Sequence, residues 1–268
     1  SSNLKYYFAM ADLSLKGGSA KEAIADFNQI LHRDPKNLEA IIKLSKVYFF
    51  DQDYSNSLVQ LAKAEELDKN NSEIWFVRGL NLKEMKDSTQ AIAAFQHAVT
   101  LKQDFYDAYI QLGLLTSNKP SHLAAQYFDN AIRLDSTNAE AYYDKGKFYQ
   151  DRGDAAFGNN KMDDADENYA LAKSVYHQLI GANPQYENAY FNLGFILTRQ
   201  DSLDKAYRMF DYAIKVKPDF AEAYYYRGLI EQQQGNKEQA QSDFRQAITL
   251  KPDYDLAQKE LNSLGSSK

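Results

Sequence analysis

The sequence predicts an all-α solenoid, built from seven helix-turn-helix repeats and a short C-terminal capping helix. Three observations lead to this prediction. Prolines recur at a fixed spacing, small and aromatic residues recur at fixed places between them, and the last residues form one separate amphipathic segment. The repeats decide the fold class, because a chain of 268 residues without repeats would be expected to form one or two globular domains.

The period of the repeats comes from the prolines. Pro184, Pro218 and Pro252 are 34 residues apart, and each follows a stretch whose apolar residues have helical spacing. Proline cannot continue a helix, so each one marks the end of a repeat and the turn into the next. Pro35 stands in the same setting near the other end of the chain.

Sliding the chain along itself by this period aligns columns of similar residues. The eighth position of the repeats is always small: Ala11, Ser45, Gly79, Gly113, Gly146, Gly194 and Gly228. The twentieth position is also small: Ala23, Ser57, Ala91, Ala124, Ala172, Ala206 and Ala240. The twenty-fourth position is large and apolar or aromatic: Phe27, Leu61, Phe95, Phe128, Tyr176, Phe210 and Phe244.

These columns predict two closely packed helices in each repeat. The eighth position falls on the apolar stripe of a first helix, and the twentieth and twenty-fourth fall on that of a second helix. The small residues let the two backbones approach, while the large residues fill the space around them. The repeats are expected at residues 4–37, 38–71, 72–105, 106–138, 139–186, 187–220 and 221–254.

The fifth repeat exceeds the regular period by 14 residues, which lie between Gly153 and Ala172. Within this insertion Ala165 and Tyr169 continue the apolar stripe of the second helix, and Gly158-Asn159-Asn160 is typical of a turn. The insertion therefore predicts that both helices of this repeat extend into a protruding hairpin.

The capping helix is predicted at residues 255–264. Leu256, Ala257, Leu261 and Leu264 are expected on its packed side, with polar residues on the other. A solenoid needs such a polar-backed end because its last repeat has no following neighbour.

The pattern resembles the tetratricopeptide repeat, whose signature of an aromatic residue, Leu-Gly, Tyr, Ala, Phe, Ala and Pro is followed over residues 4–254. The resemblance implies one domain over residues 1–268, coiled into a right-handed superhelix with the first helices lining the concave face. It also implies that the chain binds other proteins. Members that clamp the C-terminal carboxylate of a chaperone have Lys and Asn where this chain has Phe8 and Asp12, so that activity is not expected.

Composition argues against several other functions. The net charge is -6 and no concentrated basic stretch exists, whereas nucleic-acid binding normally needs a basic face. No apolar run is long enough to span a membrane, and the chain has no cysteine for disulfides or thiolate chemistry. The compartment stays open between the cytoplasm and, where an export signal precedes Ser1, the periplasm or envelope.

The sequence carries no sign of a catalytic or metal site. His32, His97, His122 and His177 fall in four different repeats without partners at ligand spacing. The acidic stretch 163–167 lacks the pattern of a calcium loop and is explained by the preference of acidic residues for a first helical turn. We therefore expect no enzyme activity, no cofactor and no metal.

The candidate site is an apolar groove on the concave face, formed by the fifth and ninth positions of the first helices. Its expected residues are Phe76, Leu80, Ile110, Leu114, Tyr143, Lys147, Phe191, Asn192, Phe195, Tyr225 and Leu229. Lys46, Lys83, Arg199 and Gln232 are further polar residues that could orient a partner there. The alternative is that neighbouring repeats cover these side chains, in which case they serve the fold.

The sequence thus predicts a non-enzymatic scaffold or adaptor that binds an apolar or amphipathic protein segment in this groove. The hairpin of the fifth repeat is a further candidate contact. A recruitment arm of a larger enzyme or envelope protein is the second hypothesis, and a homodimerisation module is the third. The sequence decides neither the partner nor whether the chain is a monomer or a homodimer.

Overall fold

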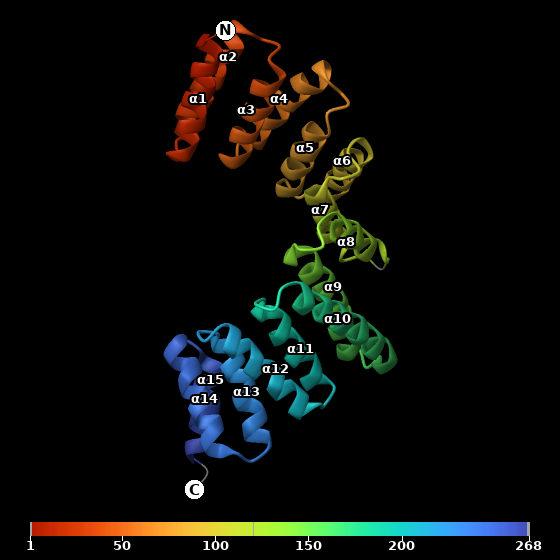
Figure 1. Ribbon diagram of the computed structural model, residues 1–268, viewed down its shortest axis with the longest axis vertical. Coiled ribbons are helices and arrows are strands. Elements are labelled where there is room, and N and C mark those ends of the chain that lie inside the picture. The colour runs from red at the N-terminus through yellow and green to blue at the C-terminus, as the bar shows by residue number, and fades with distance from the viewer. Residues whose placement is uncertain (1, 120, 267–268) are drawn as a thin grey trace. The chain divides into compact units, whose positions relative to one another are not determined.

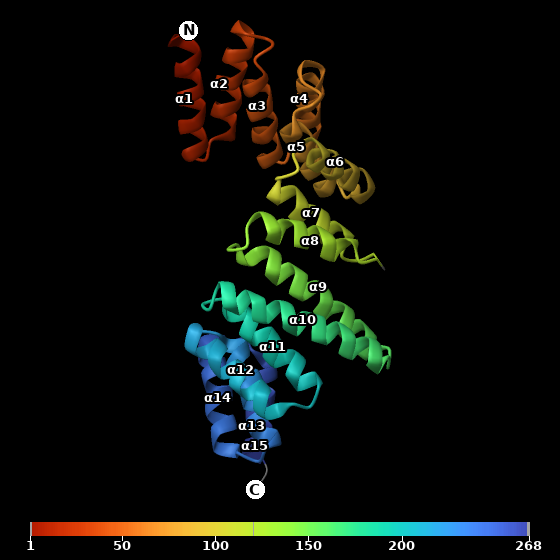
Figure 2. The ribbon, with the colours of Figure 1, turned by 45° about the vertical axis from the view of Figure 1, so that its right-hand side comes forward.

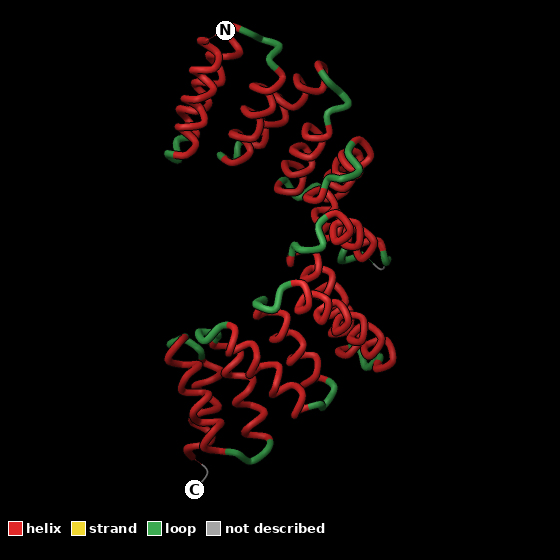
Figure 3. The backbone as a smooth tube through the Cα atoms, in the orientation of Figure 1, coloured by secondary structure: helices red, strands yellow, loops and turns green. Residues whose placement is uncertain are grey.

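The computed structural model describes residues 2–119 and 121–266, and every regular element within them is an α-helix (Figures 1 and 3). The helices follow one another as antiparallel pairs joined by short turns (Figure 2). The all-α solenoid predicted from the repeats is thereby confirmed. The chain divides into two compact halves, Ser1–Leu134 and Asp135–Lys268.

The N-terminal half contains four helix pairs. They are α1 (Ser2–Lys16) with α2 (Ala20–Arg33), α3 (Leu38–Phe50) with α4 (Tyr54–Leu67), α5 (Ser72–Glu84) with α6 (Ser88–Leu101), and α7 (Tyr106–Thr116) with α8 (Leu123–Leu134). In each pair the first member is the predicted first helix of a repeat and the second member is the predicted second helix.

The C-terminal half contains three pairs and one last helix. They are α9 (Ala139–Gly158) with α10 (Met162–Ala182), α11 (Glu187–Arg199) with α12 (Leu203–Val216), α13 (Ala221–Gln233) with α14 (Lys237–Leu250), and α15 (Asp255–Ser266). Helices α9 and α10 have 20 and 21 residues, against 13 and 14 in α11 and α12. The hairpin predicted from the insertion is therefore present.

The turns inside five of the repeats share a backbone conformation. Gly18, Gln52, Lys86, Asp201 and Gly235 hold the same position of their repeats, and all have positive φ angles. The following residue is the N-cap of the second helix; Asp53 and Asp87, for example, accept hydrogen bonds from backbone N–H groups in the first turn. An aspartate at this position stabilises the helix start because it satisfies otherwise unpaired donors.

The two helices of a repeat meet at a glycine and an aromatic ring, as the columns predict. A Cβ atom on Gly79 would lie 2.6 Å from the ring of Phe95, and one on Gly113 would lie 2.4 Å from that of Phe128. Gly146, Gly194 and Gly228 face their aromatic partners with similar spacing. No larger residue fits between helix and ring without moving one of them, so the close approach depends on glycine.

The hairpin of the fifth repeat contains a second contact of the same kind, nearer to its tip. A Cβ atom on Gly153, seven residues after Gly146, would lie 2.6 Å from the ring of Tyr169, seven residues before Tyr176. Tyr169 is fully buried, and its hydroxyl donates a hydrogen bond to Asp154 Oδ1 over 2.7 Å. The insertion thus adds two turns to each helix without changing the face on which they pack.

We expect deletion of residues 154–167 to leave a folded, helical protein with similar melting behaviour. The deletion joins Gly153 to Asn168, which places a glycine at the turn position with positive φ and an asparagine at the start of the second helix. Thermal melts followed by circular dichroism test this. An aggregated product, or a large fall in melting temperature, would show that the contact between Gly153 and Tyr169 is needed for the fold.

The capping helix is present as α15, with one difference from the sequence prediction. Ala257 is buried, and Leu261 and Leu264 are half-buried against the preceding repeat, but Leu256 is exposed. The buried residues recur at i, i+4 and i+7, and Leu256 lies one residue off that stripe. No helix in the described part of the chain is long and apolar enough to cross a membrane.

Candidate functional site

The predicted groove residues lie on first helices of both halves of the chain. In the N-terminal half they are Phe76 and Leu80 on α5 and Ile110 and Leu114 on α7. In the C-terminal half they are Tyr143 and Lys147 on α9, Phe191, Asn192 and Phe195 on α11, and Tyr225 and Leu229 on α13. Within each helix the fifth and ninth positions are four residues apart and therefore share a face.

An aromatic residue at the fifth position packs between two rings of its own repeat, one on the second helix and one at the last residue. The Phe76 ring lies 5.6 Å from Phe95 and 4.7 Å from Phe105, measured between centroids. Phe191 lies in the same way between Phe210 and Phe220, at 5.6 and 4.9 Å. These spacings are typical of favourable aromatic pairs, so the fifth position has a packing role in addition to any contact with a partner.

The last residue of the repeat, which supplies the second ring in these contacts, was not among the residues predicted from the sequence. That residue is Phe105, Tyr186, Phe220 or Tyr254 in the repeats with an aromatic pair, and Asn37, Asn71 or Asn138 in the other three. The three asparagines accept hydrogen bonds from the first turn of the next helix, whereas Phe105, Tyr186 and Phe220 make no such bond. The presence of either asparagine or an aromatic residue at the end of each repeat is the sequence feature that could have predicted these contacts.

Three of the predicted groove residues are not at the surface. Ile110, Asn192 and Tyr225 are only 2%, 7% and 8% exposed. The amide of Asn192 donates a hydrogen bond to the Tyr176 hydroxyl over 3.0 Å, which ties α11 to the preceding second helix. Neighbouring helices therefore cover these three side chains, and they belong to the core of their halves.

The ninth position is where apolar side chains reach the surface. Leu114 is 42% exposed, and Leu80, Phe195 and Leu229 are half-buried. Phe195 also packs edge-on against Tyr226, with ring centroids 5.7 Å apart. Each half thus has two apolar ninth-position residues, the apolar pair Leu80 and Leu114 in the N-terminal half and the apolar pair Phe195 and Leu229 in the C-terminal half.

Most of the polar residues proposed to orient a partner are already paired. Lys83 Nζ on α5 donates to Gln111 Oε1 on α7 over 2.8 Å, and Gln232 Nε2 on α13 donates to Glu260 Oε2 on the capping helix α15 over 3.2 Å. Lys46 on α3 pairs with Glu73 on α5. Lys147 pairs with Asp151 on its own helix. The bonds of Lys46 and Lys83 thus join successive first helices.

Arg199 connects the hairpin to the first-helix face of the C-terminal half. Its guanidinium carbon lies 5.1 Å from the Phe157 ring and 5.2 Å from the Phe195 ring. An arginine above aromatic faces at these distances is held by cation–π attraction. Phe157 and Phe195 thus share Arg199 as a common neighbour, which spacing along the chain could not predict.

An unusual carboxyl group lies beside Tyr143 on α9. Burial, together with the smaller effect of the nearby Glu140 carboxylate, raises the pKa of Asp144 from 3.8 to about 6. The pKa of Tyr186 rises to about 12, first because of burial and then because of Tyr143 and Asp144. A carboxylate that is partly buried and lies near another carboxylate destabilises the folded state when it is charged.

We expect Asp144→Asn to raise the melting temperature at about pH 7.5 and to have no such effect near about pH 4. The folded-state pKa lies above the unfolded value, so the penalty is fully present above about 6 and disappears as the pH falls through 3.8. Melts at several pH values test this, with the exposed Asp219→Asn as the matched control. An equal gain at both pH values would contradict it.

The four histidines are exposed, and His97 lies against Trp75 with ring centroids 4.2 Å apart. Among the described residues, no three His, Asp or Glu side chains lie together in a way that could hold a metal ion.

Comparison with known protein families finds two matching models. The model described as tetratricopeptide repeat matches residues 221–254, which are the limits predicted for the seventh repeat. A second model, described as the TT21 fifth ARM repeats domain, matches residues 7–112.

Curated relatives are distant and longer than the matched region. The chain is 27% identical over 131 residues to the protein O-mannosyl-transferase TMTC1 of Mus musculus, a match of 47% of this chain and 14% of the relative. It is 23% identical over 232 residues to a TPR repeat-containing protein of Methanocaldococcus jannaschii, covering 80% of this chain and 38% of the relative. The chain therefore spans a small part of both relatives.

Similar solved structures share the fold. The C-terminal part of a TPR repeat-containing protein from Cytophaga hutchinsonii superposes with a TM-score of 0.74 and 21% identity, covering 95% of this chain and 99% of the other. YrrB, described as a TPR protein with an unusual peptide-binding site, gives 0.54 and 22%, covering 75% and 97%. PilW, a type IV pilus biogenesis factor, gives 0.60 and 21%, covering 84% and 98%.

Proposed function

The chain belongs to the tetratricopeptide-repeat proteins, and from this premise we propose that it holds an apolar or amphipathic segment of a partner protein against its first helices. The repeat fold is a scaffold for protein interactions. The observation that supports this proposal is that the ninth position brings apolar side chains to the surface: Leu114 is exposed, and Leu80, Phe195 and Leu229 are half-buried.

The chemistry of this surface favours a segment with its own apolar face. The polar residues around the apolar pairs are bonded to the next first helix, as with Lys83 and Gln111. Affinity would then come from burial of Leu114 and Phe195, at about 25 cal/mol for each Å² of apolar surface removed from water. Helix-in-groove recognition uses such apolar anchors. The peptide-binding site named for YrrB supports the proposal at the level of the fold.

We expect Leu80→Ser with Leu114→Ser, and separately Phe195→Ser with Leu229→Ser, to weaken partner binding by about tenfold or more, since central anchors are worth about 2 kcal/mol. Affinity capture followed by mass spectrometry identifies the partner, and titration of that partner with each variant measures the loss. Circular dichroism should show an unchanged helical signal.

Two further variants make the result interpretable. Val59→Ser changes an exposed apolar residue on a second helix and should leave binding intact. Leu112→Ser changes a buried residue of α7 and should unfold its half of the chain. If the ninth-position variants behave like Leu112→Ser and lose their helical signal, these residues serve the fold and the proposed binding face is refuted.

A recruitment arm of a larger enzyme is the second candidate, because the match to TMTC1 takes up only 14% of that relative's length. In this case the helices would bring a substrate or a partner to a catalytic region elsewhere in the protein. The length of the natural gene distinguishes the two candidates. Homodimerisation is decided by the mass of the protein in solution.

A further inference from the structure

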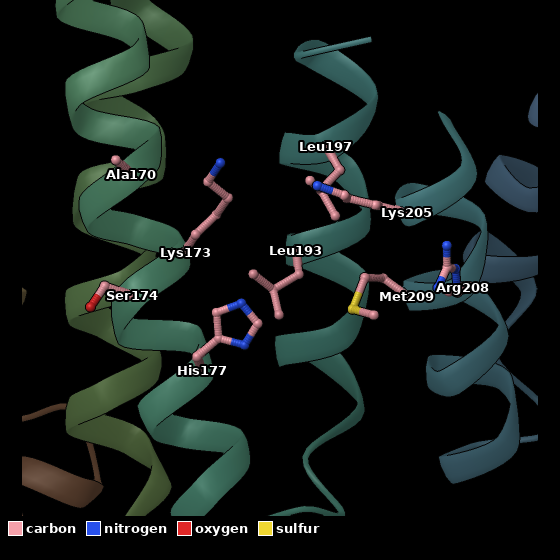
Figure 4. A pocket seen from close by; sticks show the side chains of 9 residues that line it. All are labelled: Ala170, Lys173, Ser174, His177, Leu193, Leu197, Lys205, Arg208 and Met209. Atoms are coloured by element: carbon pink, nitrogen blue, oxygen red, sulfur yellow. The ribbon is translucent and has the colours of Figure 1, made fainter. Parts of the chain in front are cut away.

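A pocket of about 490 Å³ lies on a different face of the C-terminal half, where the second helices α10 and α12 flank the first helix α11 (Figure 4). It is lined by Ala170, Lys173, Ser174, His177, Leu193, Leu197, Lys205, Arg208 and Met209. None of these residues belongs to the groove predicted on the first helices.

The pocket combines an apolar floor with a basic rim. Figure 4 shows Leu193 and Leu197 on α11 between the two second helices, with Met209 extending toward Leu193 from α12. Every titratable lining residue is basic: Lys173, His177, Lys205 and Arg208. No carboxylate lines the pocket, although the whole chain carries a net charge of -6.

The positive charges of the rim are not neutralised from within. Lys173 Nζ donates to the amide oxygen of Gln200 over 2.7 Å, and Arg208 Nε makes only a long contact of 3.4 Å to the backbone oxygen of Asp204. The Asp204 carboxylate accepts instead from Gln234 Nε2. Within the described chain, Lys205 has neither an ion pair nor a side-chain hydrogen bond.

We propose that this pocket binds an acidic amphipathic segment of a partner protein, with apolar side chains on the floor and carboxylates on the rim. The volume is within the range of sites that take a few side chains or a small ligand. Carboxylates can form charge-assisted hydrogen bonds with Lys205 and Arg208, and the apolar floor adds burial that a simple anion cannot use. The proposal adds a second face to the one proposed for the first helices.

The test uses the full chain and two short fluorescent peptides. One combines Leu with Glu at helical spacing, and the other replaces every Glu by Lys. Fluorescence anisotropy should show binding of the acidic peptide only. Lys205→Glu with Arg208→Glu should weaken that binding by about tenfold or more, which corresponds to about 1.4 kcal/mol, because it replaces two attractive charge pairs by repulsive ones. Lys237→Glu with Arg245→Glu makes the same change of charge on α14 and should have little effect.

Several outcomes would overturn the proposal. Equal losses in both double variants would mean non-specific attraction, and equal binding of an acidic peptide with Ser in place of Leu would mean a site for any anion. Self-association that Lys205→Glu with Arg208→Glu abolishes would make a second copy of this chain the occupant. The variants Phe195→Ser and Leu229→Ser should bind the acidic peptide normally, which separates this face from that of the first helices.

Discussion

Phe95→Ala should lower the free energy of unfolding by about 3 to 5 kcal/mol, the cost found for removing a buried aromatic side chain. Phe95 is fully buried in the N-terminal half, and its ring lies against Gly79 on one side and 5.6 Å from Phe76 on another. Truncation leaves a cavity between α5 and α6 that the rigid helix pair cannot close. Because neighbouring repeats stabilise one another, the loss should be seen in thermal and denaturant unfolding of the whole half.

The matched control is Phe50→Ala, which makes the same change at a ring that is 76% exposed in the same half. Among the residues that the structure describes, its one ring partner is Phe49, at 5.6 Å, so the expected cost is at most about 1 kcal/mol. Equal effects of the two substitutions would mean that the assignment of Phe95 to the helix seam is wrong.

Gly79 supplies an independent check of the same contact. Gly79→Ala alone should be destabilising by about 1 to 3 kcal/mol, since its Cβ would meet the Phe95 ring at 2.6 Å. In the Phe95→Ala background the same substitution should be tolerated or stabilising, because alanine is the better helix former. A double-mutant cycle with no coupling between the two positions would contradict the contact.

The fold was predictable from the sequence because repetition gives the same evidence several times. A single Gly79 or Phe95 says little, but a small residue and a large residue at matching places in seven repeats indicate a close helix pair. The helix lengths of the fifth repeat followed as well, since a 14-residue insertion that keeps the apolar stripe can only lengthen both helices in phase.

The candidate site was predictable only in part. Spacing places Ile110 and Leu114 on one face of α7, yet it cannot tell that the first is buried and the second exposed. That difference depends on residues from neighbouring helices, such as the aromatic at the end of each repeat. The pocket between α10 and α12 depends likewise on side chains of three helices, and no column of the repeat marks it.

Arg227 is another feature that the sequence did not reveal, and it leads to the second large effect. Its guanidinium donates two hydrogen bonds of 2.8 Å to the Asp243 carboxylate and one of 2.9 Å to Asp211. It also lies 5.4 Å above the Tyr224 ring. One residue of α13 thus connects α12 and α14, and Asp243 is buried.

Arg227→Ala should therefore destabilise the C-terminal half by about 3 to 5 kcal/mol, because it leaves the Asp243 carboxylate buried without its counter-ion. Asp211 is less affected, since Lys215 Nζ lies 2.7 Å from its carboxylate. Arg245→Ala, at an exposed arginine of α14, is the control and should cost little.

A variant that removes both charges distinguishes two causes of this destabilisation, the unpaired carboxylate and the lost packing of the arginine side chain. Arg227→Met with Asp243→Leu should recover most of the stability, because a buried ion pair can be replaced by apolar residues of similar volume at little cost. Arg227→Lys should fall between the parent and Arg227→Ala, since lysine keeps the charge but cannot form the paired hydrogen bonds. Denaturant unfolding of the four proteins measures the order. If the double variant is as unstable as Arg227→Ala, the loss comes from packing of the arginine side chain on Tyr224 and not from the unpaired carboxylate.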